Sequence, residues 1–123
     1  MNHLDSVSLS EKFATFDEVF QPRRVAHLNG QVVKLVKAKG EFVWHHHEHE
    51  DELFFIHAGQ ITIQYRDRDV VIKAGEFHVV PKGVEHCPKA DEVCEIVLFE
   101  PDHVVNTGSA TDSNMTIEEE PFI

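Results

Sequence analysis

The sequence predicts an all-β protein in which short strands close into a small sandwich or barrel, preceded by one short helix. The chain has 123 residues, enough for one hydrophobic core and too few for two ordinary domains. Between residues 25 and 99, short runs rich in β-branched and aromatic residues alternate with turn residues. The pattern changes on either side, so we expect a helical extension over 1–24, a barrel over 25–100 and an acidic tail over 101–123.

The N-terminal extension has the pattern of an amphipathic helix. Ser8 and Glu11 have the spacing of a capping box, in which each side chain satisfies a free N–H group at the helix start. Four apolar side chains at helical spacing would share one face: Leu9, Phe13, Phe16 and Phe20. Pro22 then ends the predicted helix.

The predicted strands follow one another at short intervals. They cover residues 25–28, 31–38, 41–47, 52–57, 60–65, 69–73, 77–80, 84–87 and 93–99. Turn residues such as Asn29-Gly30 and Gly59 separate them. The last run, from Val93 to Phe99, is apolar on nearly both faces, which predicts a central position in the sheet.

Composition excludes several classes of partner. The formal net charge is −11, and an acidic surface repels both nucleic acid and anionic membranes. No apolar run approaches the ~20 residues of a membrane helix, and the N-terminus lacks the features of a secretory signal. Cys87 and Cys94 are too few for a disulfide scaffold, so we read them as reduced, buried thiols. We therefore expect a cytoplasmic protein.

The charges are unevenly distributed along the chain. Residues 100–123 contain six acidic residues and no Lys or Arg, so the tail holds about half of the acidic excess. The closing Pro121-Phe122-Ile123 is its apolar anchor, to pack on the barrel or on a second subunit. The early lysines, Lys34, Lys37 and Lys39, have the pattern of a solvated strand edge.

The number and clustering of the histidines predict a metal site. The chain has ten, and four fall within five positions: His45, His46, His47 and His49. This cluster is internal, whereas a purification tag lies at a terminus. In a strand, residues two apart point to the same face with Cα atoms ~6.6 Å apart, so the side chains of His45 and His47 can converge on one ion, while His46 points away.

Two further residues complete a candidate ligand set. Glu52 begins the next predicted strand and His86 follows the Pro81-Lys82-Gly83 turn. Three imidazoles and one carboxylate suit a single divalent Fe, Mn, Ni, Cu or Zn ion and are poor ligands for calcium. A shifted register would use His47 and His49 instead. The side chains of His57 and His78 could face either the cavity or the surface.

At these residues the sequence resembles the cupin superfamily, in particular its small single-domain bacterial members. The first cupin motif is G-x5-H-x-H-x(3,4)-E-x6-G, and this chain reads GEFVWHHHEHEDELFFIHAG from Gly40 to Gly59, with four residues rather than five after Gly40. The second motif is G-x5-P-x-G-x2-H-x3-N. Its positions are filled by Gly75, Pro81, Gly83 and His86, with Ala90 in place of the final Asn.

The resemblance implies a double-stranded β-helix, a small jelly roll, that holds one metal on His45, His47, Glu52 and His86. Four protein ligands in an octahedral frame leave two positions for oxygen, water or a small-molecule ligand. The family resemblance implies either dioxygenase-like cleavage or isomerisation of sugars and keto compounds. The alternative is a non-enzymatic module that binds a metal or a small molecule.

Two residue patterns bear on the reaction and on assembly. Few Lys or Arg residues are placed to hold a phosphate, whereas apolar residues such as Phe42 and Phe54 surround the predicted site, which favours an apolar ligand and dioxygenase-like chemistry.

The apolar helix face and the closing Phe122-Ile123 exceed what one small barrel must cover, which predicts a homodimer.

Overall fold

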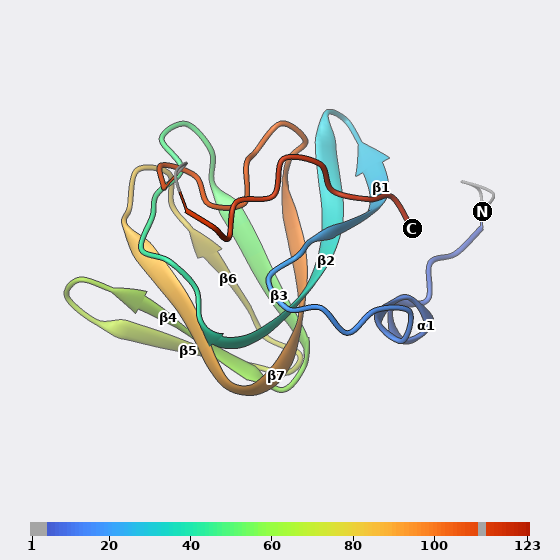
Figure 1. The fold of residues 1–123 in the computed structure, drawn as a ribbon, viewed down its shortest axis with the longest axis horizontal. Helices are drawn as coiled ribbons and strands as arrows, with labels where there is room; N and C mark the ends of the chain where they lie inside the picture. Colours follow the sequence, from blue (N-terminus) through green and yellow to red (C-terminus); the bar gives the residue numbers. More distant parts are fainter. Residues whose placement is uncertain (1–4, 111–112) are drawn as a thin grey trace.

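The computed structural model describes residues 5–110 and 113–123, so Met1–Leu4 of the predicted extension and Asp112 of the acidic tail lie outside the described residues. Seven strands follow one helix (Figure 1). Their bounds are α1 Leu9–Phe13, β1 Arg23–Leu28, β2 Gln31–Glu41, β3 Glu52–Ala58, β4 Gln60–Tyr65, β5 Asp69–Lys73, β6 Phe77–Val80 and β7 His86–Pro101. The all-β prediction with a short N-terminal helix is confirmed.

Strand β7 organises the barrel. The strand order is β1-β2-β7-β3-β6, all pairs are antiparallel, and β4 pairs with both β5 and β7. The first residues of β7 pair with β4, and its second half lies between β2 and β3. One 16-residue strand thus replaces the two predicted runs at 84–87 and 93–99, and its central position confirms the reading of the last run.

The predicted helix is longer than the observed one. Ser8 caps α1 as expected, since its hydroxyl accepts a hydrogen bond from the Glu11 N–H at 3.2 Å. The helix ends at Phe13, because the chain beyond it runs along β2, where Val19 bridges Lys37 and the Phe20 N–H donates to the Lys37 carbonyl. The Phe16 side chain is therefore buried although its backbone is not helical, and Phe20 adopts a positive φ of 57°.

The strand predicted over residues 41–47 is also absent. Strand β2 ends at Glu41, after its register with β7 shifts near Gly40, which has a φ of 84°. Beyond this point the contacts with β7 are isolated: the Phe42 N–H donates to the Pro88 carbonyl at 2.9 Å, and His45 forms a bridge with His86 through two backbone hydrogen bonds of 3.0 and 2.9 Å. The two metal-motif histidines of this segment therefore lie on the connection between β2 and β3 rather than on a strand.

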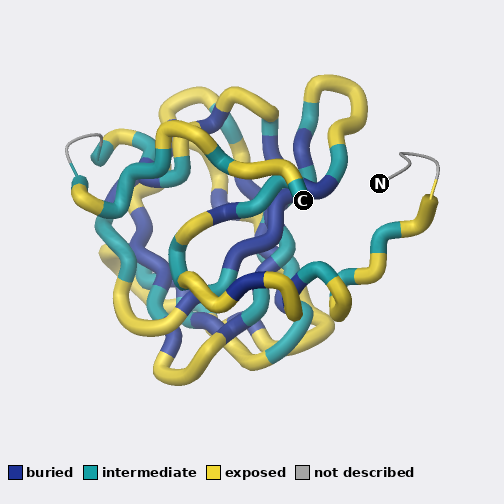
Figure 2. The backbone as a smooth tube through the Cα atoms, turned by 45° about the vertical axis from the view of Figure 1, so that its right-hand side comes forward, coloured by how far each residue is buried: buried dark blue, intermediate teal, exposed yellow. Residues whose placement is uncertain are grey.

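Two apolar clusters stabilise the fold, and the buried stretches run through the middle of the molecule (Figure 2). The larger cluster fills the barrel, with Phe54, Ile63 and Ile96 among its members. The smaller lies outside the sheet, where Phe13 and Phe16 cover Leu35. The helix face that predicted a dimer is thus covered by the chain's own barrel.

Alternation along β2 corrects the expectation for Lys34. Lys34 lies two residues from Val32 and from Val36, on the face that looks into the barrel, whereas Leu35 looks toward α1. The Lys34 side chain is accordingly 0% exposed. The prediction that Lys34 lies on a solvated edge is wrong, because its strand is covered on both faces.

Candidate metal centre

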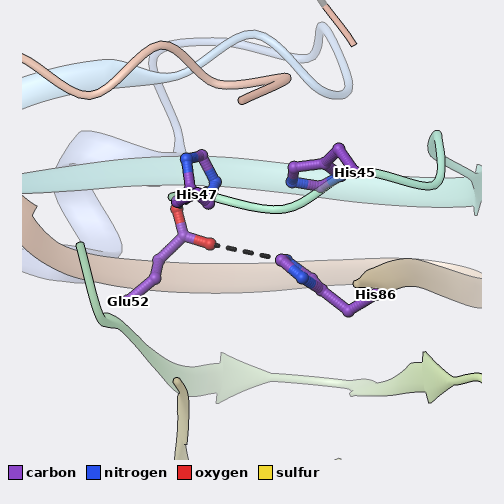
Figure 3. A group of neighbouring side chains, drawn as sticks. All are labelled: His45, His47, Glu52 and His86. Carbon is purple, nitrogen blue, oxygen red and sulfur yellow. Dashed lines mark ion pairs between the residues drawn. The ribbon is translucent and has the colours of Figure 1, made fainter. Parts of the chain in front are cut away.

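Three side chains from one short stretch of chain and a fourth from β7 converge inside the barrel. The ligand atoms of His45, His47, Glu52 and His86 all lie within 4.8 Å of one another, and all four residues are buried. Figure 3 shows the three imidazoles and the carboxylate directed toward a common point. Neither His46 nor the exposed His49 belongs to this cluster, so the structure brings together the set predicted from the spacing and not the shifted register.

Backbone hydrogen bonds orient two of the imidazoles. His45 Nδ1 lies 2.8 Å from the Val43 carbonyl oxygen, and His86 Nδ1 lies 3.0 Å from the Val84 carbonyl oxygen. A carbonyl can only accept, so each Nδ1 carries the proton and each Nε2 keeps a free lone pair. Such an N–H to carbonyl bond is the usual outer contact of a metal-ligating histidine.

Two buried nitrogens in this cluster have no hydrogen-bond partner among the described residues. They are His47 Nε2 and His86 Nε2. Each faces a carboxylate oxygen of Glu52, at 3.6 Å from His47 and 3.8 Å from His86, which is too far for a hydrogen bond. Ligands bound at ~2.1 Å on one ion lie ~3 to ~4 Å apart, so these separations and the unpartnered nitrogens fit a divalent transition metal between them.

Burial keeps the imidazoles neutral. The pKa of His45 is lowered to about 3, mainly by burial and to a smaller extent by the neighbouring His86. Burial also lowers the pKa values of His47 and His86. The close contacts of His47 and His86 with Glu52 are therefore not ion pairs at neutral pH. A neutral imidazole is the form that binds a metal, so the site offers its ligands without first losing protons from the histidines.

A buried charge network adjoins the carboxylate side of the site. The carboxyl groups of Glu52 and Glu100 are close neighbours, and a Glu100 oxygen lies 2.8 Å from the Lys34 ammonium. Burial and the adjacent Glu52 raise the pKa of Glu100 well above its usual value. Lys34 also pairs at 2.8 Å with Glu120 of the tail. This network was not predicted from the sequence, although strand alternation places Lys34 and Glu100 on the interior face.

Trp44, His57 and His78 do not belong to the ligand cluster. Trp44 points away from the site and lies under the Arg66 guanidinium, 3.7 Å from the ring centroid. His57 stacks on Phe13 beneath α1. His78 is half-buried, and its Nε2 lies 2.7 Å from the Tyr65 hydroxyl.

An apolar cavity of about 50 Å³ lies beside the cluster. Its walls include His45, Glu52 and Glu100 of the buried polar network. The other lining residues are mainly apolar: Phe20, Pro22, Val36, Phe42, Phe54, Ile61, Pro88, Ile96, Leu98 and, as one polar exception, Asn106. None of the residues that line this cavity is a Lys or Arg, so no cationic side chain is present there to hold a phosphate.

The protein is thus a small antiparallel jelly-roll barrel that gathers three histidines and a glutamate, residues that could hold a metal ion, in its interior. Comparison with known sequences gives the family, because the sequence model described as "Cupin domain" matches residues 31–100. The chain belongs to the cupin family, which confirms the resemblance found in its two motifs.

Individual relatives agree with this assignment. The chain is 34% identical over 79 residues to the protein YdbB of Bacillus subtilis (strain 168), a match that covers 63% of this chain and 64%, less than two thirds, of YdbB. A crystal structure of a cupin-2 domain containing protein from Shewanella frigidimarina is 44% identical, with a TM-score of 0.76 over 77% of this chain and 93% of that one. Protein NMB1881 from Neisseria meningitidis is 31% identical, with a TM-score of 0.73 over 80% and 100% of the two chains.

Among the described residues no helix has the length and apolar character needed to cross a bilayer.

Proposed function

We propose that this cupin binds one divalent transition-metal ion through His45, His47, Glu52 and His86 and acts there on a small, largely apolar molecule. The observation that carries the proposal is the convergence of four buried ligand atoms within 4.8 Å, two of them nitrogens that have no hydrogen-bond partner. A bound ion of this type would supply Lewis-acid or one-electron chemistry. The protein would supply the orientation of the ligands and the dry cavity.

The apolar cavity supports a dioxygenase-like reaction over an isomerase acting on phosphosugars. Lys34, the one buried lysine among the described residues, is held by Glu100 and Glu120 and so cannot serve a substrate phosphate. Arg66 lies against Trp44 and Glu85 on the outside. Aromatic residues such as Phe42 and Phe54 instead line the cavity. These contacts favour an apolar or aromatic substrate.

Metal content tests the binding set. Untagged protein is incubated with Fe, Mn, Ni or Zn, desalted and assayed by elemental analysis, and we expect about one ion per chain. His47→Ala and His86→Ala should lose the ion, whereas His46→Ala should retain it, because the His46 side chain lies outside the cluster. Less than ~0.2 ion per chain in the wild-type protein under all four conditions would refute the metal assignment.

Oxygen consumption tests the reaction type. Iron- or copper-loaded protein is supplied with a panel of small aromatic and keto compounds, and substrate-dependent oxygen uptake is expected. His86→Ala is the matched control, because it should lack the ion. A protein that binds only zinc and consumes no oxygen would instead support the alternative, an isomerase or a non-enzymatic binding module.

The proposal includes a cytoplasmic homodimer. The two buried free thiols suit a reducing compartment. The exposed apolar side chains Phe77 and Val79 lie on β6, an edge strand with one unpaired side that a second copy could cover. Light scattering at micromolar concentration should give twice 14.1 kDa for the wild type and a smaller species for Phe77→Lys. A wild-type protein that is only monomeric would refute the dimer.

A further inference from the structure

The C-terminal segment lies against the backbone that carries the metal-motif histidines. In Figure 1 this segment, drawn in red, crosses the upper part of the molecule. The Ser109 N–H donates to the His46 carbonyl at 2.9 Å, and the His46 N–H donates to the Ser109 hydroxyl at 3.0 Å. His46 is the residue between the two motif histidines, so these bonds fix the connection from which both imidazoles project.

Gly108 brings the segment close to His47. A Cβ atom on Gly108 would collide with the His46 carbonyl oxygen and would lie 3.1 Å from Cε1 of the His47 ring. Only a residue without a side chain therefore allows this approach. Gly108 also has a positive φ of 50°, a region that glycine enters without strain. The outer wall of the His47 side is thus backbone of the C-terminal segment.

A second attachment joins the segment to the carboxylate side of the site. The Lys34 ammonium has three N–H groups and three neighbours: Glu100 at 2.8 Å, Glu120 at 2.8 Å and the Val104 carbonyl at 3.3 Å. Val104 and Glu120 belong to the C-terminal segment, and the Glu100 carboxyl adjoins that of Glu52. Arg24 adds a contact with Glu120 at 3.1 Å.

The segment also separates the interior from the outer surface. Asn106 lines the inner cavity of about 50 Å³. The neighbouring residues 103–105, 108 and 109 line an outer groove of about 250 Å³, together with residues 46–50. A cavity for a drug-sized ligand is at least ~300 Å³, so the inner one admits only a few atoms while the segment stays in place.

We propose that the described C-terminal residues 102–110 and 113–123 form a strap that closes the metal centre, with Glu120 on Lys34 as its latch. The strap retains the ion and has to shift before a ligand larger than a few atoms reaches it. This inference rests on the proposed metal site. A strap acts as a barrier in both directions, so loosening it should accelerate both uptake and release of the ion while changing affinity less.

The experiment measures zinc release to a colorimetric chelator and zinc uptake by the metal-free protein in stopped flow. Gly108→Ala should accelerate both by about tenfold, the factor that ~1.4 kcal/mol of strain in the closed strap would give. Gly30→Ala is the matched control, because Gly30 also has a positive φ, of 75°, but no atom within 4 Å of the added Cβ. We expect its rates to stay within about twofold of the wild type.

The latch is tested by a second pair of variants. Glu120→Gln keeps the shape and removes the charge that faces Lys34, and we expect faster zinc exchange and faster hydrogen exchange at the Ser109 amide of the metal-free protein. Glu119→Gln changes an exposed neighbour and should alter neither. If Gly108→Ala fails to fold, this pair decides the question.

The outcomes separate the strap from the metal site. Wild-type protein that binds no zinc refutes the proposed function itself. Wild-type protein that binds one zinc ion, with Gly108→Ala and Glu120→Gln exchanging it at the wild-type rate, refutes the strap alone. Faster release with unchanged uptake would show a weakened ligand set rather than an opened barrier, and would likewise overturn the strap.

Discussion

Replacement of Lys34 by methionine should destabilise the fold strongly. The Lys34 side chain is 0% exposed, and its partners Glu100 and Glu120 are 1% and 4% exposed. After Lys34→Met, Glu120 still has Arg24 at 3.1 Å, but no other Lys or Arg among the described residues pairs with Glu100. Glu100 must then stay buried without a cation or take up a proton, and breaking a buried pair in this way costs about 3–5 kcal/mol. For a chain of this size, that loss in the free energy of unfolding lowers the melting temperature by roughly 10–20 °C.

The assay is urea unfolding followed by far-UV circular dichroism, with a thermal melt on the same samples. Lys39→Met is the control, because Lys39 lies in the same strand but is exposed, and it should stay within about 0.5 kcal/mol of the wild type. The double variant Lys34→Met/Glu100→Gln should recover part of the loss, since it removes the unpaired charge. A Lys34→Met protein within about 1 kcal/mol of the wild type would refute the view that this ammonium neutralises a buried carboxylate.

Three further predictions concern acid, packing and thiol reactivity. Burial lowers the pKa of His45 to about 3, below the ordinary 6.5, so the stability that depends on neutral imidazole is complete above pH 6.5 and is lost as the pH falls toward 3. Melting temperatures with and without chelator should therefore converge at the acid end of a series from about pH 4 to 8, and a gap that stays constant would contradict the histidine ligands. Gly59→Ala should cost about 1–3 kcal/mol in urea unfolding, because its Cβ would lie 2.9 Å from the Val93 carbonyl oxygen at a φ of 82°. Gly40→Ala, with a φ of 84° and no neighbour within 4 Å, is the control, and equal losses would mean that strain rather than contact dominates. Burial raises the pKa of Cys87 to about 11 and that of Cys94 to about 12, so iodoacetamide should label neither in the native protein near pH 8, and rapid labelling would show that the thiols are accessible.

Tertiary pairing explains where sequence reasoning failed in the fold. The capping residue Ser8 was recognisable, but the end of α1 was not, because the pairing of Val19 with Lys37 overrides the helical spacing of Phe16 and Phe20. The segment after Glu41 has strand-like composition, but its pairing with β7 is reduced to isolated contacts at Phe42 and His45. In both cases the presence or absence of a long-range partner decided the backbone conformation.

The fold class and the four candidate ligands could be predicted from the amino-acid pattern. Alternation and turn spacing are local features of the chain, and His45, His47 and Glu52 lie within one short stretch. The surroundings of the four ligands, in contrast, depend on long-range contacts. Lys34 and Glu120 are 86 residues apart, and their pairing depends on how the C-terminal segment returns over the barrel. No local pattern encodes such a contact, because the attraction between the two charges offsets the cost of removing them from water only when the fold places them side by side.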